Sequence, residues 1–141
     1  MEGLKRLASR LGIAERVRFV GERADVARFL AAADIYCQPN VGPEAFGLTF
    51  VEAMRAGLPV VTTAIGGARE IVDDSCGVLV PPGDAHALAS SLHTLIDGPG
   101  FLRARLGEGG PCRARQLCDP AAQLQRLHRV LSVFAGREAA A

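Results

Sequence analysis

The chain has 141 residues, a length typical of a single domain. Hydrophobic residues make up 49% of it and charged residues 22%, which excludes a wholly disordered chain. The net charge is only +1, so there is neither a basic surface for nucleic acid nor an acidic tail for a basic partner.

The N-terminal half is predicted to alternate short helices and strands. Leucines at helical spacing and a stop at Gly12 predict a helix over 2–11, and the β-branched, aromatic segment 17–20 predicts a strand ending at Gly21. Asp25 is expected to cap a helix over 26–33. A strand over 34–37 and a Pro- and Gly-rich loop from Gln38 to about Gly47 follow.

The C-terminal half continues the alternation and then turns helical. A helix is predicted over 48–56, a strand over 59–62, a short helix from Gly66–Gly67 to Ile71, and a strand over 77–80. Asp84 is expected to cap a helix that runs to about Ile96. Two more helices are predicted over 101–117 and 120–135, with four helix-breaking residues in the first: Gly107, Gly109, Gly110 and Pro111.

Short apolar strands separated by helices indicate an α/β fold with a Rossmann-like parallel sheet. We expect one domain, 1–141, with an α/β core over 1–97 and C-terminal helices over 98–141. Ligands of such folds bind at the carboxyl ends of the strands. That rule directs attention to the segments after four residues: Val20, Cys37, Thr62 and Val80.

Location and metal content are constrained by what the sequence lacks. The first ten residues carry four charged side chains and no apolar stretch, unlike a signal peptide, and no run approaches a membrane span of ~20 apolar residues. The four cysteines form no C-x-x-C pair and have no zinc-like spacing to the three histidines. We expect a cytoplasmic protein without a metal site, in which the cysteines are small core residues or have no particular role.

The segment after the second strand carries two carboxylates. Glu44 lies in the loop, and Glu52 lies eight positions later inside the helix, on a narrow stripe shared with Leu48 and Arg55. One interpretation is an i,i+3 ion pair between Glu52 and Arg55 on an exposed edge. The other is a carboxylate that accepts hydrogen bonds from ligand hydroxyls, such as a ribose diol.

The start of this helix has the features of a phosphate site. Glycine at position 47 allows a ligand to approach the backbone, and the first N–H groups of a helix are free to bind an anion, assisted by the helix dipole. The alternative is that Gly47 only relieves a tight turn.

Several motifs in this order resemble the retaining glycosyltransferases of family 4, and in particular the nucleotide-sugar-binding half of their two-domain GT-B fold. The Glu-x7-Glu motif is carried by Glu44 and Glu52, and the resemblance extends over about residues 4–97. The other matching segments are Val17–Gly21, Ala33–Asp34 with Pro39, Glu52–Val61, Gly66–Gly67 with Glu70–Val72, and Cys76–Asp84.

The resemblance implies roles for individual residues. Glu44 would be the catalytic carboxylate that binds hydroxyls of the donor sugar, and Glu52 would bind the ribose diol. Backbone amides would hold the diphosphate and sugar at four residues: Phe46, Gly47, Leu48 and Thr49. Gly21 and Glu22 would lie beside the base.

The reaction implied is retaining transfer of a hexosyl group from a UDP-, GDP- or ADP-sugar to an acceptor, without a metal or other cofactor. Full-length family members are roughly two to three times longer. Two parts are therefore expected from outside this sequence or from a partner chain. One is the N-terminal domain that binds the acceptor, and the other is the first strands of the donor domain, with the Arg/Lys pair that holds the diphosphate. The isolated chain is expected to have little or no activity, and an open sheet edge would favour self-association.

Three other functions remain as alternatives. The chain would be a non-catalytic sugar-nucleotide-binding or regulatory module, an inert fragment that self-associates, or a dinucleotide-dependent oxidoreductase. No G-x-G-x-x-G follows the first predicted strand, which argues against the oxidoreductase.

Arginines make the C-terminal helices basic. These arginines form either a solvated helix face or a contact with an anionic membrane surface. They are Arg103, Arg105, Arg113, Arg115, Arg126, Arg129 and Arg137.

Overall fold

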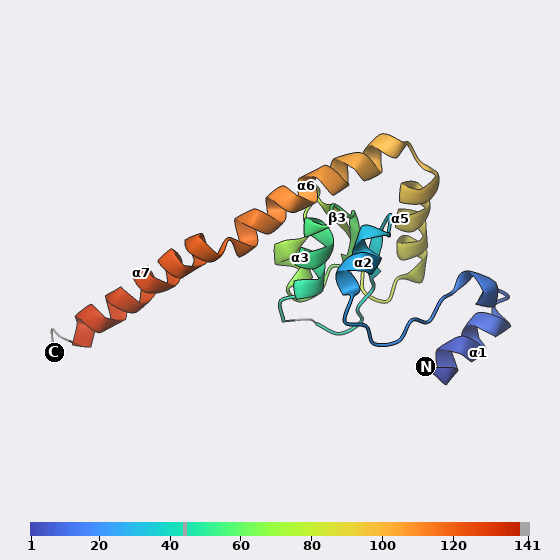
Figure 1. The fold of residues 1–141 in the computed structure, drawn as a ribbon, viewed down its shortest axis with the longest axis horizontal. Coiled ribbons are helices and arrows are strands. Elements are labelled where there is room, and N and C mark those ends of the chain that lie inside the picture. The colour runs from blue at the N-terminus through green and yellow to red at the C-terminus, as the bar shows by residue number, and fades with distance from the viewer. Residues whose placement is uncertain (44, 139–141) are drawn as a thin grey trace.

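The core of the molecule is a three-stranded parallel sheet with helices on both faces (Figure 1). The computed structural model describes residues 1–43 and 45–138. The strands are β1 (Tyr36–Gln38), β2 (Val60–Thr63) and β3 (Gly77–Val80), in the order β1-β2-β3. This confirms the α/β fold with a parallel sheet that the sequence predicts.

Seven α-helices and one 3₁₀ turn, η1, are present in the described part of the chain. Their bounds are α1 Glu2–Arg10, η1 Ala14–Arg16, α2 Val26–Ala31, α3 Leu48–Arg55, α4 Ala68–Ile71, α5 Ala85–Asp97, α6 Gly100–Cys118 and α7 Pro120–Glu138. Asp84 caps α5 as predicted, because its Oδ1 accepts a hydrogen bond of 2.8 Å from the Ala87 amide. Comparison of these bounds with the predicted ones shows that each predicted helix forms, with ends shifted by a few residues.

The central strand β2 is buried on both faces. Val60 belongs to an apolar cluster with residues of α3, α4 and α6, among them Phe50, Met54 and Ile71. Its neighbour Val61 points to the opposite face and packs with Leu95 of α5 and other residues there. Side chains alternate across a strand, so a strand covered on both faces must be apolar at consecutive positions.

The predicted strand over 17–20 is wrong. Although all four residues are described, they have no regular structure, and Val20 is 51% exposed. A strand exists only where a neighbouring strand accepts its hydrogen bonds, and the sheet of the described residues contains no strand beside this segment. The β-propensity of residues 17–20 is therefore not enough to form a strand, because there is no neighbouring strand to pair with.

The prediction that the Asp25 side chain caps α2 is also wrong. Its side chain bonds no backbone amide of α2. Instead it accepts hydrogen bonds of 2.8 and 3.0 Å from the Arg23 guanidinium, which lowers the pKa of the Asp25 carboxyl.

Helix α6 is continuous through three glycines in its interior, Gly107, Gly109 and Gly110, and each of them brings the helix close to another backbone. A Cβ at Gly107 would lie 2.5 Å from the Gly57 carbonyl oxygen, and one at Gly110 would lie 2.9 Å from that of Met54. A Cβ at Gly109 would meet the Ser75 carbonyl. Glycine thus lowers helix propensity here but allows α6 to cross the core closely.

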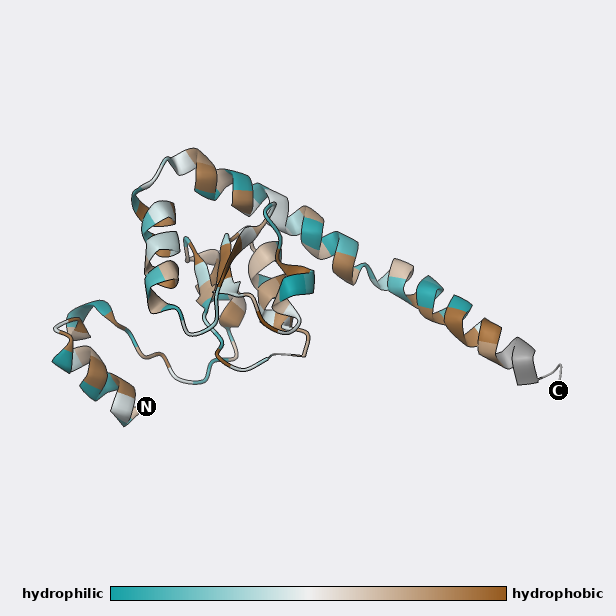
Figure 2. Cartoon of the chain, turned by 180° about the vertical axis from the view of Figure 1, so that it is seen from behind, coloured by the Kyte–Doolittle hydropathy of each residue, from teal (hydrophilic) through white to brown (hydrophobic). Residues whose placement is uncertain are grey.

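Helices α1 and α7 extend away from this core at opposite sides (Figure 1). Every residue of α7 from Pro120 to Phe134 is exposed. Figure 2 shows hydrophobic and hydrophilic residues alternating along the same helix. None of the described helices is long and apolar enough to cross a membrane.

Candidate functional site

The candidate site is built on the start of α3. Gly47 has φ +83°, a left-handed conformation that favours glycine, and the Phe50 ring occupies the space that a Cβ would need. From this turn the helix buries one face, formed by Phe50, Val51, Ala53 and Met54. Packing of this face therefore holds the body of α3 against the core.

Two backbone amides at this helix end have no acceptor among the described residues. The Phe50 N–H donates to the Gly47 carbonyl at 3.0 Å, whereas the N–H groups of Leu48 and Thr49 have no hydrogen bond in the part of the chain that the structure describes. Both residues are exposed. The positive end of the helix dipole adds to these donors, so the turn can bind an anionic group.

The outward stripe of α3 carries Leu48, Glu52 and Arg55, and all three are exposed. Between residues 45 and 138, no ion pair joins Glu52 to Arg55 or to another group. The i,i+3 ion pair expected from spacing is therefore not formed. The Glu52 carboxylate faces solvent, one helical turn beyond the free amides of Leu48 and Thr49.

A hollow of about 540 Å³ lies beside Glu52, between α2 and α3. Apolar side chains form most of its wall, and the charged groups of Glu52 and Arg55 contribute to it. The lining residues are Ala24, Val26, Ala27, Leu30, Glu52, Arg55 and Ala56. An apolar wall with a carboxylate and a guanidinium suits a flat heterocycle attached to a diol.

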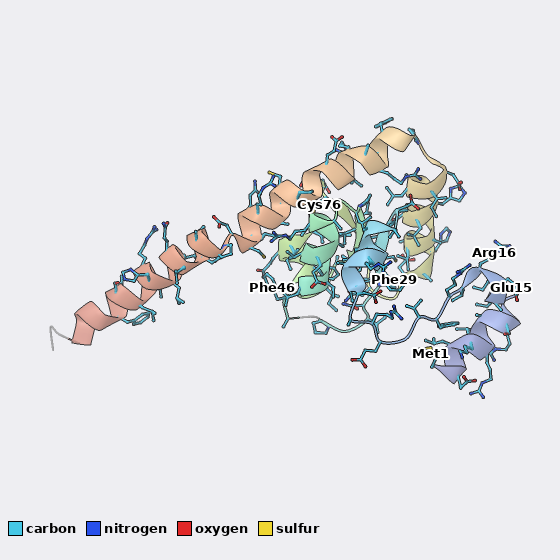
Figure 3. All side chains as sticks on the ribbon, viewed as in Figure 1. Met1, Glu15, Arg16, Phe29, Phe46 and Cys76 are labelled. Atoms are coloured by element: carbon cyan, nitrogen blue, oxygen red, sulfur yellow. The ribbon has the colours of Figure 1, made fainter. Side chains whose placement is uncertain are left out.

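The other predicted site residues do not all lie on α3. Phe46 is 45% exposed and lies beside the start of α3, as Figure 3 shows. Gly21 (φ +69°) and Glu22 are exposed and precede the wall of the hollow, which begins at Ala24. Glu44, the predicted catalytic carboxylate, lies outside the described residues.

A polar network at the end of β1 was missed by the sequence analysis. The side-chain oxygen of Gln38 accepts hydrogen bonds from the hydroxyls of Tyr36 and Thr49, the latter at 2.8 Å. The backbone of this segment is held in turn by β2, since Thr62 Oγ1 donates to the Gln38 carbonyl and Thr63 Oγ1 to that of Asn40, both at 2.7 Å. Residue spacing gave no signal for it, because the partners lie as far as 24 positions apart.

Gly67, which directly precedes α4, lies against the loop that leads into the same site. A Cβ at Gly67 would lie 2.8 Å from the carbonyl oxygen of Ala45 and 3.0 Å from that of Phe46. Glycine is therefore needed for α4 to approach the loop that leads into α3.

A smaller hollow, of about 230 Å³, lies at the carboxyl ends of the three strands. It is lined by the residues that follow the strands and by the start of α5: Pro39, Val41, Thr63, Val80, Pro81, Gly83, Asp84, Ala85 and Leu88. Within residues 1–43 and 45–138, no group of three or more His, Cys, Asp or Glu side chains could hold a metal ion.

Comparison with known proteins assigns the chain to one family. Residues 1–98 match the model of the family described as "Glycosyl transferases group 1". The chain belongs to this family of transferases, and its architecture is that of the nucleotide-sugar-binding half of the GT-B fold.

Known relatives are much longer than this chain. It is 37% identical over 126 residues to the phosphatidyl-myo-inositol mannosyltransferase of Mycobacterium leprae, a match that covers 86% of this chain and 33% of the relative. It superposes with a TM-score of 0.87 and 34% identity on a crystal structure of Anabaena Alr3699/HepE in complex with UDP, over 94% of this chain and 36% of the other. The same Anabaena protein with UDP-glucose gives a TM-score of 0.84. The chain therefore spans about a third of the proteins it resembles.

Proposed function

We propose that this chain is the donor-binding part of a retaining glycosyltransferase and binds a nucleoside diphosphate sugar. The observation that carries the proposal is the arrangement on α3. Two free amides at its first turn and an unpaired carboxylate one turn later lie on the solvent side of the same helix. A diphosphate and a ribose diol are joined at about this separation in a nucleotide.

Each group has a distinct role in this proposal. The Leu48 and Thr49 amides hydrogen-bond the diphosphate, and charged hydrogen bonds of this kind contribute roughly 1.5–3 kcal/mol each. Glu52 accepts hydrogen bonds from the ribose diol, and the base enters the hollow between α2 and α3. The Anabaena structures with UDP and UDP-glucose support a uridine nucleotide as the first one to test.

The chemical step follows from the same contacts. The departing nucleoside diphosphate gains negative charge while the sugar becomes oxocarbenium-like. Backbone donors placed at the diphosphate stabilise that charge in the transition state, by ~3–4 kcal/mol for a well-placed donor. The family resemblance assigns contacts with the sugar hydroxyls to Glu44, and it implies transfer with retention and without a metal ion.

The acceptor and the rest of the transferase are proposed to come from outside this sequence. The chain covers 33% of the mannosyltransferase relative. The backbone groups of Cys37 that point away from β2 face no strand of the described residues. The first strands of the donor domain would complete the sheet at this edge, and the isolated chain would bind donor without transferring sugar.

The test is a titration of the chain with UDP, GDP, ADP and NAD in the presence of EDTA, in which binding is detected by NMR. One nucleoside diphosphate should bind, and Glu52→Ala should weaken it about tenfold, because the ribose diol loses a charged acceptor. Glu108→Ala, an exposed glutamate of α6, is the matched control and should bind like the wild type. Binding of NAD alone, or equal affinities of the wild type and Glu52→Ala, would contradict the proposal.

A further inference from the structure

Gln38 joins three elements at the end of β1. It is the last residue of the strand, and its carbonyl oxygen accepts a hydrogen bond of 2.7 Å from Thr62 Oγ1 of the central strand. Thr62 is fully buried. The backbone of Gln38 is therefore tied to the buried central strand of the sheet.

The side chain of Gln38 extends from this fixed point to α3. Its Oε1 accepts a hydrogen bond of 2.8 Å from Thr49 Oγ1, and Thr49 is the second residue of the helix. The Tyr36 hydroxyl donates to the same oxygen. One amide oxygen thus connects β1 to the first turn of α3 across 11 positions of sequence.

The first turn of α3 needs such a connection. Most helices are held at this end by a Ser, Thr, Asp or Asn cap, but the cap residue here is Gly47, which has no side chain to accept a hydrogen bond. Free first-turn amides fray unless other contacts hold them. The Thr49 hydroxyl bonded to Gln38 supplies a polar anchor while the Thr49 amide stays available to a ligand.

We propose that Gln38 is a positioning residue of the diphosphate site, which acts through Thr49 to hold the first-turn amides of α3 in place. The inference rests on the proposed function for its ligand, whereas the ordering of the helix end is a property of the chain alone. Gln38 itself needs no contact with the nucleotide.

The first experiment measures amide hydrogen exchange without ligand. Gln38→Met and Thr49→Val each remove one side of the hydrogen bond at similar volume. Each should accelerate exchange of the Phe50 amide, which bonds the Gly47 carbonyl, about three- to tenfold. The Val60 amide, bonded to Cys76 in the sheet, should be unchanged. Thr49→Ser, which keeps the hydroxyl, should restore the wild-type rate.

The second experiment compares UDP with uridine, which lacks the phosphates. Gln38→Met and Thr49→Val should each weaken the binding of UDP about three- to tenfold and leave the affinity for uridine unchanged. The double variant should bind UDP no more weakly than Gln38→Met alone, because Gln38→Met already breaks the hydrogen bond that Thr49→Val removes. Thr94→Val removes an exposed hydroxyl that bonds the Ser90 carbonyl in α5, and this matched control should have no effect.

The two experiments separate the two claims. An unchanged Phe50 exchange rate in Gln38→Met and Thr49→Val would overturn the role of Gln38, as would equal loss of UDP and uridine. A wild-type chain that binds no diphosphate would overturn the proposed function, while the exchange rates would still decide whether Gln38 orders the helix end.

Discussion

At the scale of single residues, the site depends on what α3 leaves unpaired. A buried helix satisfies its side chains by packing, and the inner face of α3 does so with Phe50 and Met54. Its outer face keeps a carboxylate at Glu52 without an ion pair to any group in the described part of the chain. Together with two free amides, this gives the outer face the polar groups on which the proposed nucleotide site depends.

Gly47 provides a residue-scale prediction about stability. Gly47→Ala places a Cβ at φ +83° and against the Phe50 ring, so it should reduce the free energy of unfolding by about 2–4 kcal/mol. Gly83→Ala is the control, because Gly83 has φ +76° but no atom within 4 Å of the added Cβ. It should cost only about 1–2 kcal/mol. Urea unfolding of the two variants measures the difference, and equal losses would show that the ring contact has no effect.

At the scale of elements, a clamp between α6 and the end of α4 fixes one side of the core. The Arg113 guanidinium donates to the carbonyls of Glu70 and Ile71, at 2.5 and 3.1 Å, and lies 3.1 Å from the Asp73 carboxylate. Since the last carbonyls of a helix have no partner within it, Arg113 stabilises the end of α4.

This clamp predicts a pH dependence. Hydrogen bonds from Ser75, and then the charge of Arg113, lower the pKa of Asp73 from its ordinary 3.8. A lowered folded-state pKa contributes stability above about pH 3.8, which is lost as the pH falls through the folded-state pKa. Asp73→Asn should therefore lose a few tenths of a kcal/mol at pH 6, because the pair is partly exposed, and this loss should shrink as the pH falls below 3.8. Chemical unfolding at each pH measures the free energies, and Asp74→Asn is the control variant. The argument would be contradicted if the stability difference between wild type and Asp73→Asn grew as the pH was lowered.

Much of the fold is predictable from periodicity, since helices and parallel strands have distinct apolar patterns. The strand predicted at 17–20 failed because pairing depends on neighbours that a local pattern does not contain. The α6 glycines could be interpreted only once the backbones they touch were known. At the site, Glu52 and the amides follow from position along one helix, whereas the Gln38–Thr49 contact depends on how β1 meets α3.

At the scale of the whole molecule, the chain leaves apolar surface uncovered. On α7 six large hydrophobic side chains are 47–67% exposed: Leu124, Leu127, Val130, Leu131, Val133 and Phe134. Four of them recur at i, i+3, i+7 and i+10 and form a seam along the helix. Apolar surface of this kind marks a contact with another domain or another chain.

This surface predicts self-association of the isolated chain. Leu127→Glu with Leu131→Glu should shift the sedimentation of the chain toward the monomer at high concentration. The melting temperature should stay within a few degrees of the wild-type value, because residues 120–134 of α7 are exposed. Gln125→Glu with Ser132→Glu adds the same charge outside the seam and should not change association. A wild-type chain that stays monomeric at all concentrations would contradict the prediction.

The central claim is that one face of α3 binds a nucleoside diphosphate. Its most direct test is a map of backbone amide shifts when UDP is added to the uniformly ¹⁵N-labelled wild-type chain. The account predicts that the largest shifts occur at Leu48 and Thr49, with others at Glu52 and around Ala24 in the hollow. Shifts confined to other surfaces, such as α5 or α7, or no shifts at millimolar UDP, GDP and ADP, would contradict it.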